Sequence, residues 1–127
     1  MAVNGIDHYN LRAPMAVLEG LRDWYRDIIG LAVGDRPPFR NRGFWLYAGS
    51  HPVLHLSEES TGESHPMPGA GTFDHVAFRC EDFDAMRAAL DAKGVAYRTA
   101  DVPLTRTRQI FLEDPAGNGV ELNFELR

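Results

Sequence analysis

The stretch GTFDHVAFRC, residues 71–80, repeats a phrase from near the start of the chain, NGIDHYNLRA, residues 4–13. Each places an Asp-His pair after a glycine, inside a run with the residue alternation of a β-strand. The two histidines, His8 and His75, lie 67 positions apart (75 − 8 = 67). Self-similarity at a fixed offset indicates a duplicated unit, so we predict that the chain contains two copies of one module.

The elements predicted around these phrases support the same repeat. Each half reads as a strand, a helix and three more strands, because apolar residues recur at helical spacing after the first strand and then return to strand-like runs. The predicted elements span 3–11, 14–30, 31–34, 44–49 and 52–57 in the first half, and 72–80, 82–93, 95–99, 107–114 and 119–126 in the second. We therefore expect an α+β fold of two βαβββ modules, about 1–57 and 72–127, joined by a polar linker at about 58–71.

Size and charge narrow the class of protein. The chain has 127 residues, which suits a single domain, and a formal net charge of −5 with a pI near 5.4. The one lysine, Lys93, and the absence of any dense Lys/Arg run weigh against a nucleic-acid partner. The one cysteine, Cys80, excludes an intrachain disulfide and fits a reducing, cytoplasmic setting, where it is expected to pack as a small structural residue. No apolar run is long enough to span a membrane.

Four polar residues occupy equivalent places in the predicted strands. Matching the ends of the two halves sets His55 against Glu121 at an offset of 66 (121 − 55 = 66), beside the pair His8 and His75. The neighbours of each are mostly large and apolar and point to the opposite face of the strand, where helices are expected to cover them. On a curved sheet the four side chains converge in one concavity. Three imidazoles and a carboxylate are good ligands for a divalent transition metal, so we predict a metal site from this set.

The remaining histidines and the repeated aspartates are not predicted to bind the metal. His51 and His65 lie in predicted loops and are not expected to be ligands. Asp7 and Asp74 also repeat, but strand alternation sends them to the face opposite the histidines that follow them. We therefore expect these aspartates to be strand-edge residues, neither binding nor orienting a metal ligand.

Several sequence motifs, spread over nearly the whole chain, resemble those of a known protein family. The phrases IDHYNLRAP, LRDWYRDIIGLAVG, FDHVAFRCEDFDAMRAAL and FLEDPAGNGVELNF resemble those of the vicinal oxygen chelate superfamily, the glyoxalase, bleomycin-resistance and extradiol-dioxygenase group. The last phrase is the most specific, because members typically end with Asp-Pro-x-Gly and then a strand that supplies a metal-binding Glu. Here these residues are Asp114, Pro115, Gly117 and Glu121.

The resemblance implies a mechanism and a set of site residues. It implies paired modules whose sheets curl around one divalent ion, iron(II), manganese(II), zinc or nickel, held by His8, His75 and Glu121. The ion takes up two neighbouring oxygens of a small substrate and stabilises the charge that develops on them, with Glu121 as the catalytic carboxylate. His55 departs from the pattern, because glyoxalase-like members usually have Glu or Gln there and ring-cleaving dioxygenases do not use the position. The site is three His and one Glu if His55 binds, and a two-His-one-carboxylate triad if it does not.

Candidate substrate contacts come from the strands next to the ligand strands. Trp45 and Phe111 are related by the repeat (111 − 45 = 66), and Gln109 shares a face with Phe111. We expect these three residues to bind substrate; Arg106 and Arg108 are candidates to receive an anionic substrate.

Three classes of function remain open. The first is a metal-dependent enzyme, either a ring-cleaving dioxygenase or a glyoxalase-like lyase or isomerase. The second is a metal-free protein that binds an antibiotic or another small molecule, and the presence of His8, His75 and Glu121 favours the enzyme over it. The third, thiol transfer to an antibiotic epoxide, needs a potassium loop and a phosphonate-binding cluster that the sequence does not reveal. The resemblance also implies a homodimer, in which one site can draw residues from two chains.

Overall fold

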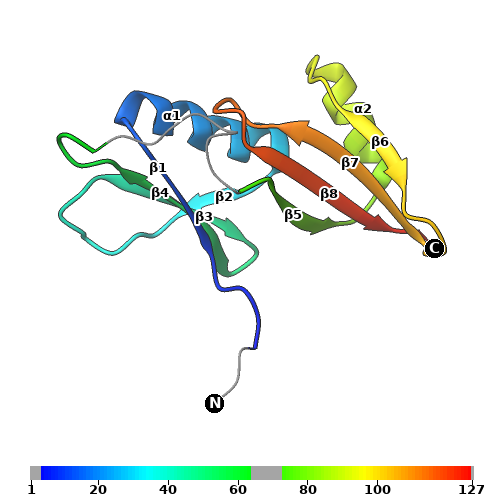
Figure 1. The fold of residues 1–127 in the computed structure, drawn as a ribbon, viewed down its shortest axis with the longest axis horizontal. Coiled ribbons are helices and arrows are strands. Elements are labelled where there is room, and N and C mark those ends of the chain that lie inside the picture. Colours follow the sequence, from blue (N-terminus) through cyan, green and yellow to red (C-terminus); the bar gives the residue numbers. More distant parts are fainter. Residues whose placement is uncertain (1–3, 64–72, 127) are drawn as a thin grey trace. The chain divides into compact units, whose positions relative to one another are not determined.

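Two four-stranded mixed sheets organise the chain, one in each half (Figure 1). The structure is a computed structural model that describes residues 4–63 and 73–126, so most of the predicted linker and His65 lie outside the described residues. The chain divides into two compact units, Met1–Pro66 and Met67–Arg127. Each unit is a βαβββ module with its own open sheet, which confirms the predicted α+β class.

The first unit follows the predicted order of elements. Its strands are β1 (Tyr9–Ala13), β2 (Ala32–Gly34), β3 (Gly43–Ala48) and β4 (His51–Glu58), and its helix α1 (Met15–Trp24) continues into a π-helical turn, η1 (Tyr25–Ile29). The helical segment ends at Gly30, which adopts the left-handed conformation (φ 95°) that glycine tolerates best. The sheet order is β1-β4-β3-β2.

The second unit repeats this arrangement. It comprises β5 (His75–Cys80), α2 (Phe83–Ala92), β6 (Arg98–Asp101), β7 (Thr107–Glu113) and β8 (Gly119–Glu125), in the sheet order β5-β8-β7-β6. Helix α2 is capped at its N-terminus, because the side chain of Asp82 accepts a hydrogen bond from the backbone N–H of Ala85 at 3.1 Å.

The strand register confirms the repeat more closely than the order of elements does. In the first sheet β1 runs parallel to β4, and Asn10, two residues after His8, lies opposite His55. In the second sheet β5 runs parallel to β8, and Ala77, two residues after His75, lies opposite Glu121. The two modules therefore place the predicted ligand positions in the same relation to each other.

Three strand boundaries differ from the prediction, and one of them is the start of β5, which lies at His75 and not at residue 72. The other two are explained by strand pairing. The first strand begins at Tyr9 and not near residue 3, because its ladder with β4 starts at the pair Tyr9 and Leu54. The predicted strand 95–99 lies instead at Arg98–Asp101, where β7 pairs with it. In both cases the available partner strand decides the boundary, and local residue preference does not.

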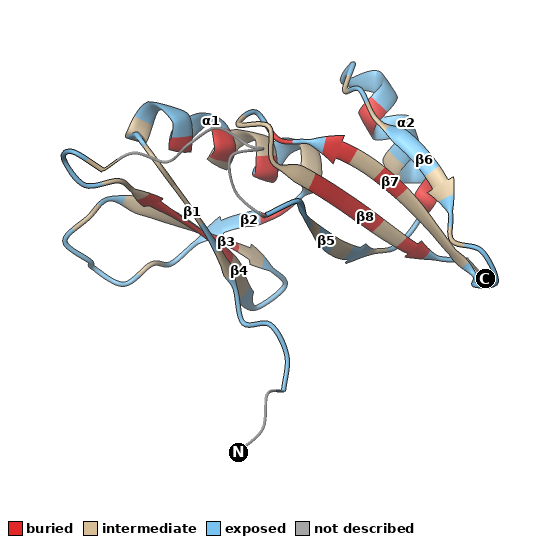
Figure 2. Cartoon of the chain, in the orientation of Figure 1, coloured by how far each residue is buried: buried red, intermediate tan, exposed pale blue. Residues whose placement is uncertain are grey.

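Each unit buries a core between its helix and one face of its sheet (Figure 2). In the first unit the core residues are Leu18, Leu21, Tyr25, Leu46, Leu54 and Leu56; in the second they are Phe83, Leu90, Ile110, Leu112, Val120, Leu122 and Phe124. Each such side chain contributes about 1.5–3 kcal/mol on burial. The rings of Phe83 and Phe124 meet edge to face at 5.5 Å, which docks α2 on β8. Among the described helices none is long and apolar enough to cross a membrane.

The turn before β8 is held by one buried carboxylate. Oδ1 of Asp114 accepts hydrogen bonds from the backbone N–H groups of Ala116 and Asn118, each at 2.9 Å, and Oδ2 accepts one from Nδ2 of Asn118 at 2.9 Å. Asp114 is only 4% exposed, so these donors lose their partner if the carboxylate is removed. The turn thereby sets where β8 begins, and with it the position of Glu121.

We predict that Asp114→Ala lowers the free energy of unfolding by about 2 kcal/mol, because it leaves partly buried N–H groups unpaired. Chemical denaturation followed by circular dichroism measures this value. Glu113→Ala, which removes the exposed carboxylate of the neighbouring residue, is the control and should change stability by less than about 0.5 kcal/mol. Equal losses in the two variants would contradict a structural role for the Asp114 contacts.

Candidate functional site

The second unit brings a histidine and a carboxylate together on the face of the sheet opposite α2. Nε2 of His75, at the start of β5, lies 3.6 Å from Oε1 of Glu121, near the middle of β8. Glu121 is 8% exposed, whereas the side chain of His75 is 46% exposed. The buried carboxylate and the half-exposed imidazole form a pair of potential metal ligands that is open to solvent on one side.

A glycine makes this approach possible. His75 lies opposite Gly119 in the parallel ladder. A Cβ atom at position 119 would collide with the carbonyl oxygen of Asp74 and lie 3.0 Å from Cβ of His75. Because one of these obstacles is backbone, any side chain here would push the start of β5 away from β8. Gly119 therefore keeps His75 within reach of Glu121.

The repeated aspartates contact the histidines, so the prediction that they point away was wrong. The carboxylate of Asp74 accepts a hydrogen bond from Nδ1 of His75 at 2.8 Å, and that of Asp7 accepts one from Nδ1 of His8 at 2.7 Å. Strand alternation does not govern these aspartates, because β1 begins at Tyr9 and β5 at His75, after each of them. With the proton on Nδ1, the lone pair of a neutral ring lies on Nε2, where it can bind a metal.

The carboxylate partners affect the ionisation of His75. The hydrogen bond to Asp74 raises the pKa of this imidazole above its ordinary value of 6.5, partial desolvation opposes the rise, and the charge of Glu121 adds to it. His75 therefore keeps its proton to a higher pH in the folded chain than in the unfolded one. This interaction stabilises the fold below pH 6.5, and its contribution disappears as the pH rises through the raised pKa.

The first unit arranges its two histidines differently. The ring of His55 lies between two other rings, with centroids 3.8 Å from His8 at an interplanar angle of 15° and 4.0 Å from Trp45 at 8°. Nε2 of His55 donates to the carbonyl oxygen of Pro52 at 3.2 Å. Burial, followed by the charge of His8, lowers the pKa of His55. His55 is thus a neutral, stacked ring at neutral pH.

This stack limits what His8 and His55 can do together. A metal binds an imidazole nitrogen along its lone pair, in the plane of the ring. Two rings stacked nearly parallel have no nearby point that lies in both planes, so they do not chelate one ion in this conformation. Within residues 4–63 and 73–126, no three His, Cys, Asp or Glu side chains come together as a metal site. Each unit brings two of the four predicted ligands together.

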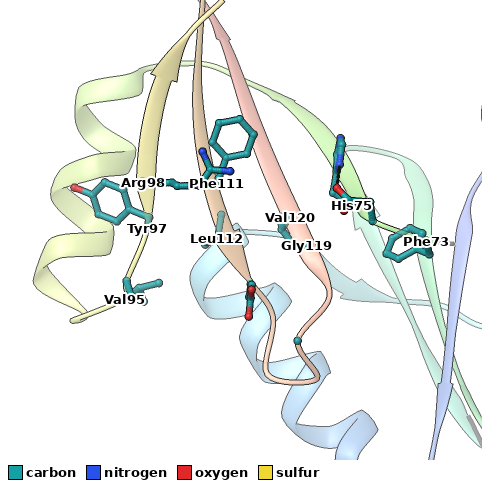
Figure 3. Close-up of a pocket in the computed structure, with 13 residues that line it drawn as sticks. Phe73, His75, Val95, Tyr97, Arg98, Phe111, Leu112, Gly119 and Val120 are labelled. Atoms are coloured by element: carbon teal, nitrogen blue, oxygen red, sulfur yellow. Dashed lines mark hydrogen bonds and ion pairs between the residues drawn. The ribbon is translucent and has the colours of Figure 1, made fainter. Parts of the chain in front are cut away.

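The predicted substrate contacts lie beside these pairs. Trp45 is directly opposite His55 in the β3–β4 ladder, and Phe111 is directly opposite Glu121 in the β7–β8 ladder. Gln109 lies opposite Asn123, on the same face as Phe111. His75 and Phe111 also line a cavity of about 1020 Å³ in the second unit (Figure 3).

The arginine in this cavity is one that the sequence did not single out. Arg98, on β6, lies opposite Phe111, and its guanidinium carbon is 4.2 Å from the centre of that ring. Arg106 and Arg108 are engaged elsewhere, because the first donates to the carbonyl of Leu126 at 2.9 Å and the second pairs with Asp101 at 2.7 Å. A predicted strand at 95–99 already contained Arg98, but its neighbours became known only from the β6–β7 register.

The contacts and burial of His51 and Cys80 indicate structural roles. His51 binds through Nε2 to the backbone oxygen of Asp7 at 2.6 Å. Burial raises the pKa of the Cys80 thiol, which keeps it protonated and unreactive, in agreement with the structural role expected for it.

Comparison with known proteins identifies the family. The model of the Glyoxalase/Bleomycin resistance protein/Dioxygenase superfamily matches residues 5–122, and the chain belongs to this superfamily. The chain has no significant match among curated proteins.

Solved structures share the fold over almost the whole chain. A protein assigned to the glyoxalase family from Bacillus anthracis matches with a TM-score of 0.76 and 24% identity, with 98% of each chain covered. Lactoylglutathione lyase from Agrobacterium tumefaciens matches with a TM-score of 0.71 and 23% identity, covering 98% of this chain and 96% of the other. TnmS3, an antibiotic-binding protein from Streptomyces sp. CB03234, matches with a TM-score of 0.68 and 24% identity, with 98% of each covered. These similarities establish the fold.

We predict that Asp74→Asn lowers the pKa of His75 in the metal-free protein, because the amide removes a charge-assisted hydrogen bond. Imidazole resonances followed by NMR across a pH titration measure this shift. Glu113→Gln, which neutralises another carboxylate lining the cavity, should leave the pKa of His75 nearly unchanged. An unaltered pKa in Asp74→Asn would contradict the contact.

Proposed function

We propose that the protein is a divalent-metal-dependent enzyme of this superfamily, acting on a small substrate that binds the metal through two neighbouring oxygens. The single observation that carries the proposal is the His75–Glu121 pair, with Nε2 and Oε1 3.6 Å apart. Two ligands of a tetrahedral ion at about 2.1 Å from each are roughly 3.4 Å apart, so the pair fits a metal. The hydrogen bond that Nδ1 of His75 donates to Asp74 orients the ring for this role.

The proposed ligand set is His8, His75 and Glu121. His8 joins it because the repeat gives it the same partner, Asp7, that Asp74 provides for His75. The stacking of His55 between Trp45 and His8 favours a set without His55, which is the two-His-one-carboxylate type. The family resemblance supports a homodimer, and the single cysteine supports a reducing, cytoplasmic setting.

The residues around the pair suit proton transfer on a bound substrate. A divalent ion held here would act as a Lewis acid on the substrate oxygens. Asp74 keeps the proton of His75 on Nδ1, so that the lone pair of Nε2 is left to bind the ion. Glu121 is buried next to Phe111 and can accept a proton from a carbon or hydroxyl of the substrate.

Metal binding is the direct test of this proposal. We predict that protein stripped of metal and titrated with zinc or manganese binds one ion per site. His75→Ala and Glu121→Ala should abolish stoichiometric binding, and Asp74→Ala should weaken it by about 10–100-fold because the ring loses its orienting partner. Isothermal titration calorimetry and elemental analysis measure these outcomes.

Two further variants sharpen the test. Glu113→Ala, a carboxylate of the same cavity, should bind metal as the wild type does. His55→Ala should keep a stoichiometric ion, and loss of the ion would instead make His55 a fourth ligand.

A metal-free binding protein is the second candidate, since one fold neighbour is described as antibiotic-binding. The Trp45–His55–His8 stack favours it, because aromatic faces bind flat ligands. Wild-type protein with no metal affinity that nevertheless binds a flat aromatic compound would support this candidate and overturn the enzyme.

A further inference from the structure

The row of side chains that contains Glu121 continues across the second sheet to an arginine. In the ladder Ala77 lies opposite Glu121, Glu121 opposite Phe111, and Phe111 opposite Arg98. Residues opposite each other in a sheet point to the same face. Arg98 therefore shares the face of the proposed metal pair, at the far edge of the sheet.

Arg98 differs from several other arginines of the chain in having no acidic partner among the described residues. Arg12, Arg42 and Arg108 each form an ion pair with a carboxylate. Within the part of the chain that the structure describes, Arg98 forms no ion pair or hydrogen bond, and its contact is with the ring of Phe111 at 4.2 Å. An unpaired guanidinium beside a cavity is available to an external anion.

The contact with Phe111 orients the guanidinium of Arg98 for binding an anion. Stacking uses the flat face of the guanidinium, while the N–H donors point outward in its plane. The ring therefore restrains the side chain without consuming a hydrogen-bond donor. A carboxylate can then receive two parallel N–H bonds along the free edge of the guanidinium.

The cavity connects the arginine with His75, the histidine of the proposed metal pair. His75, Phe111 and Arg98 all line the same space of about 1020 Å³, and Figure 3 shows the Arg98 and Phe111 side chains together, with His75 across the strands. β6 and β8 are two strands apart in the sheet, so Arg98 and Glu121 are separated by roughly 10 Å at the backbone. This length suits a small molecule with a reactive group at one end and a charged group at the other.

Other charges in the cavity give the ligand a direction. Glu113 and Asp74 also line it, at the end where β7 finishes and β5 begins. Their negative charges disfavour an anionic group there, whereas Arg98 is the cationic residue on the β6 side. An anionic group of the ligand is thus directed toward Arg98.

We propose that Arg98, held flat against Phe111, binds the carboxylate of a substrate whose opposite end reaches the His75–Glu121 pair. The substrate class is a small monocarboxylate that carries two neighbouring oxygens remote from its carboxylate. This inference rests on the proposed function for the reacting end, whereas the carboxylate end depends on Arg98 alone.

The test compares two probes that differ in one charged group. 3,4-Dihydroxybenzoate has neighbouring oxygens and a carboxylate, and 4-methylcatechol has the same oxygens with a methyl group in its place. Isothermal titration calorimetry on the full-length, zinc-loaded protein gives the ratio of the two affinities. We expect the wild type to prefer the acid by about tenfold, as hydrogen bonds to a charged group predict.

Variants assign the preference to one residue. Arg98→Gln should reduce the preference to within about twofold, because the neutral amide keeps hydrogen-bonding capacity and loses the charge. Arg79→Gln is the matched control, since Arg79 is exposed on the same face at the other edge strand, β5, and should keep the tenfold ratio. Arg98 is itself exposed, so both variants are expected to fold.

The outcomes separate the two proposals. A wild type that binds the acid no more tightly than the diol, or an Arg98→Gln variant that keeps the preference, overturns the role of Arg98. Metal-free protein that binds both probes as tightly as the zinc-loaded form overturns the chelating function. In that case the affinity ratio and its loss in Arg98→Gln still support the carboxylate site.

Discussion

The parallel pairing of β5 with β8 is the constraint on which the candidate site depends. β5 enters the sheet at His75, and the turn held by Asp114 starts β8 at Gly119. Because position 119 has no side chain, the two strand starts come close enough for His75 to face Glu121. Two residues 46 positions apart in the sequence (121 − 75 = 46) thereby become a pair of potential metal ligands.

The same backbone arrangement has different chemistry in the first unit. There the position equivalent to Glu121 is His55, and its ring fills the space between His8 and Trp45. A carboxylate in the same place would have to be hydrated, paired or bound to a cation, whereas an imidazole is satisfied by stacking and by one bond to Pro52. The two units therefore share one backbone arrangement, while this position holds His55 in the first unit and Glu121 in the second.

Much of the fold could be predicted from the sequence. In both halves apolar residues alternate along the strands and recur at helical spacing along the helices. The Asp82 cap and the Gly30 stop were predictable for the same reason, since local chemistry decides them. The contacts of Asp7 and Asp74 were missed, because alternation was applied to residues that precede the strands. The recurrence of Asp-His in both halves was the available signal.

Long-range register explains what remained hidden from the sequence. The proposed role of Arg98 depends on its position opposite Phe111 in the β6–β7 ladder. No local sequence pattern reveals that pairing. The stacking of His55 likewise depends on the β3–β4 register. Ligand positions related by a repeat can be inferred from spacing, but the orientation of their rings depends on neighbours that are distant in the sequence.

Anomalous diffraction from a crystal of the metal-loaded protein tests the central claim most directly. We predict one peak, with Nε2 of His75 and a carboxylate oxygen of Glu121 each about 2.1 Å from it. His55 should remain outside that distance. A metal bound elsewhere, or to His75 without Glu121, would contradict the claim that the β5–β8 pairing builds the centre.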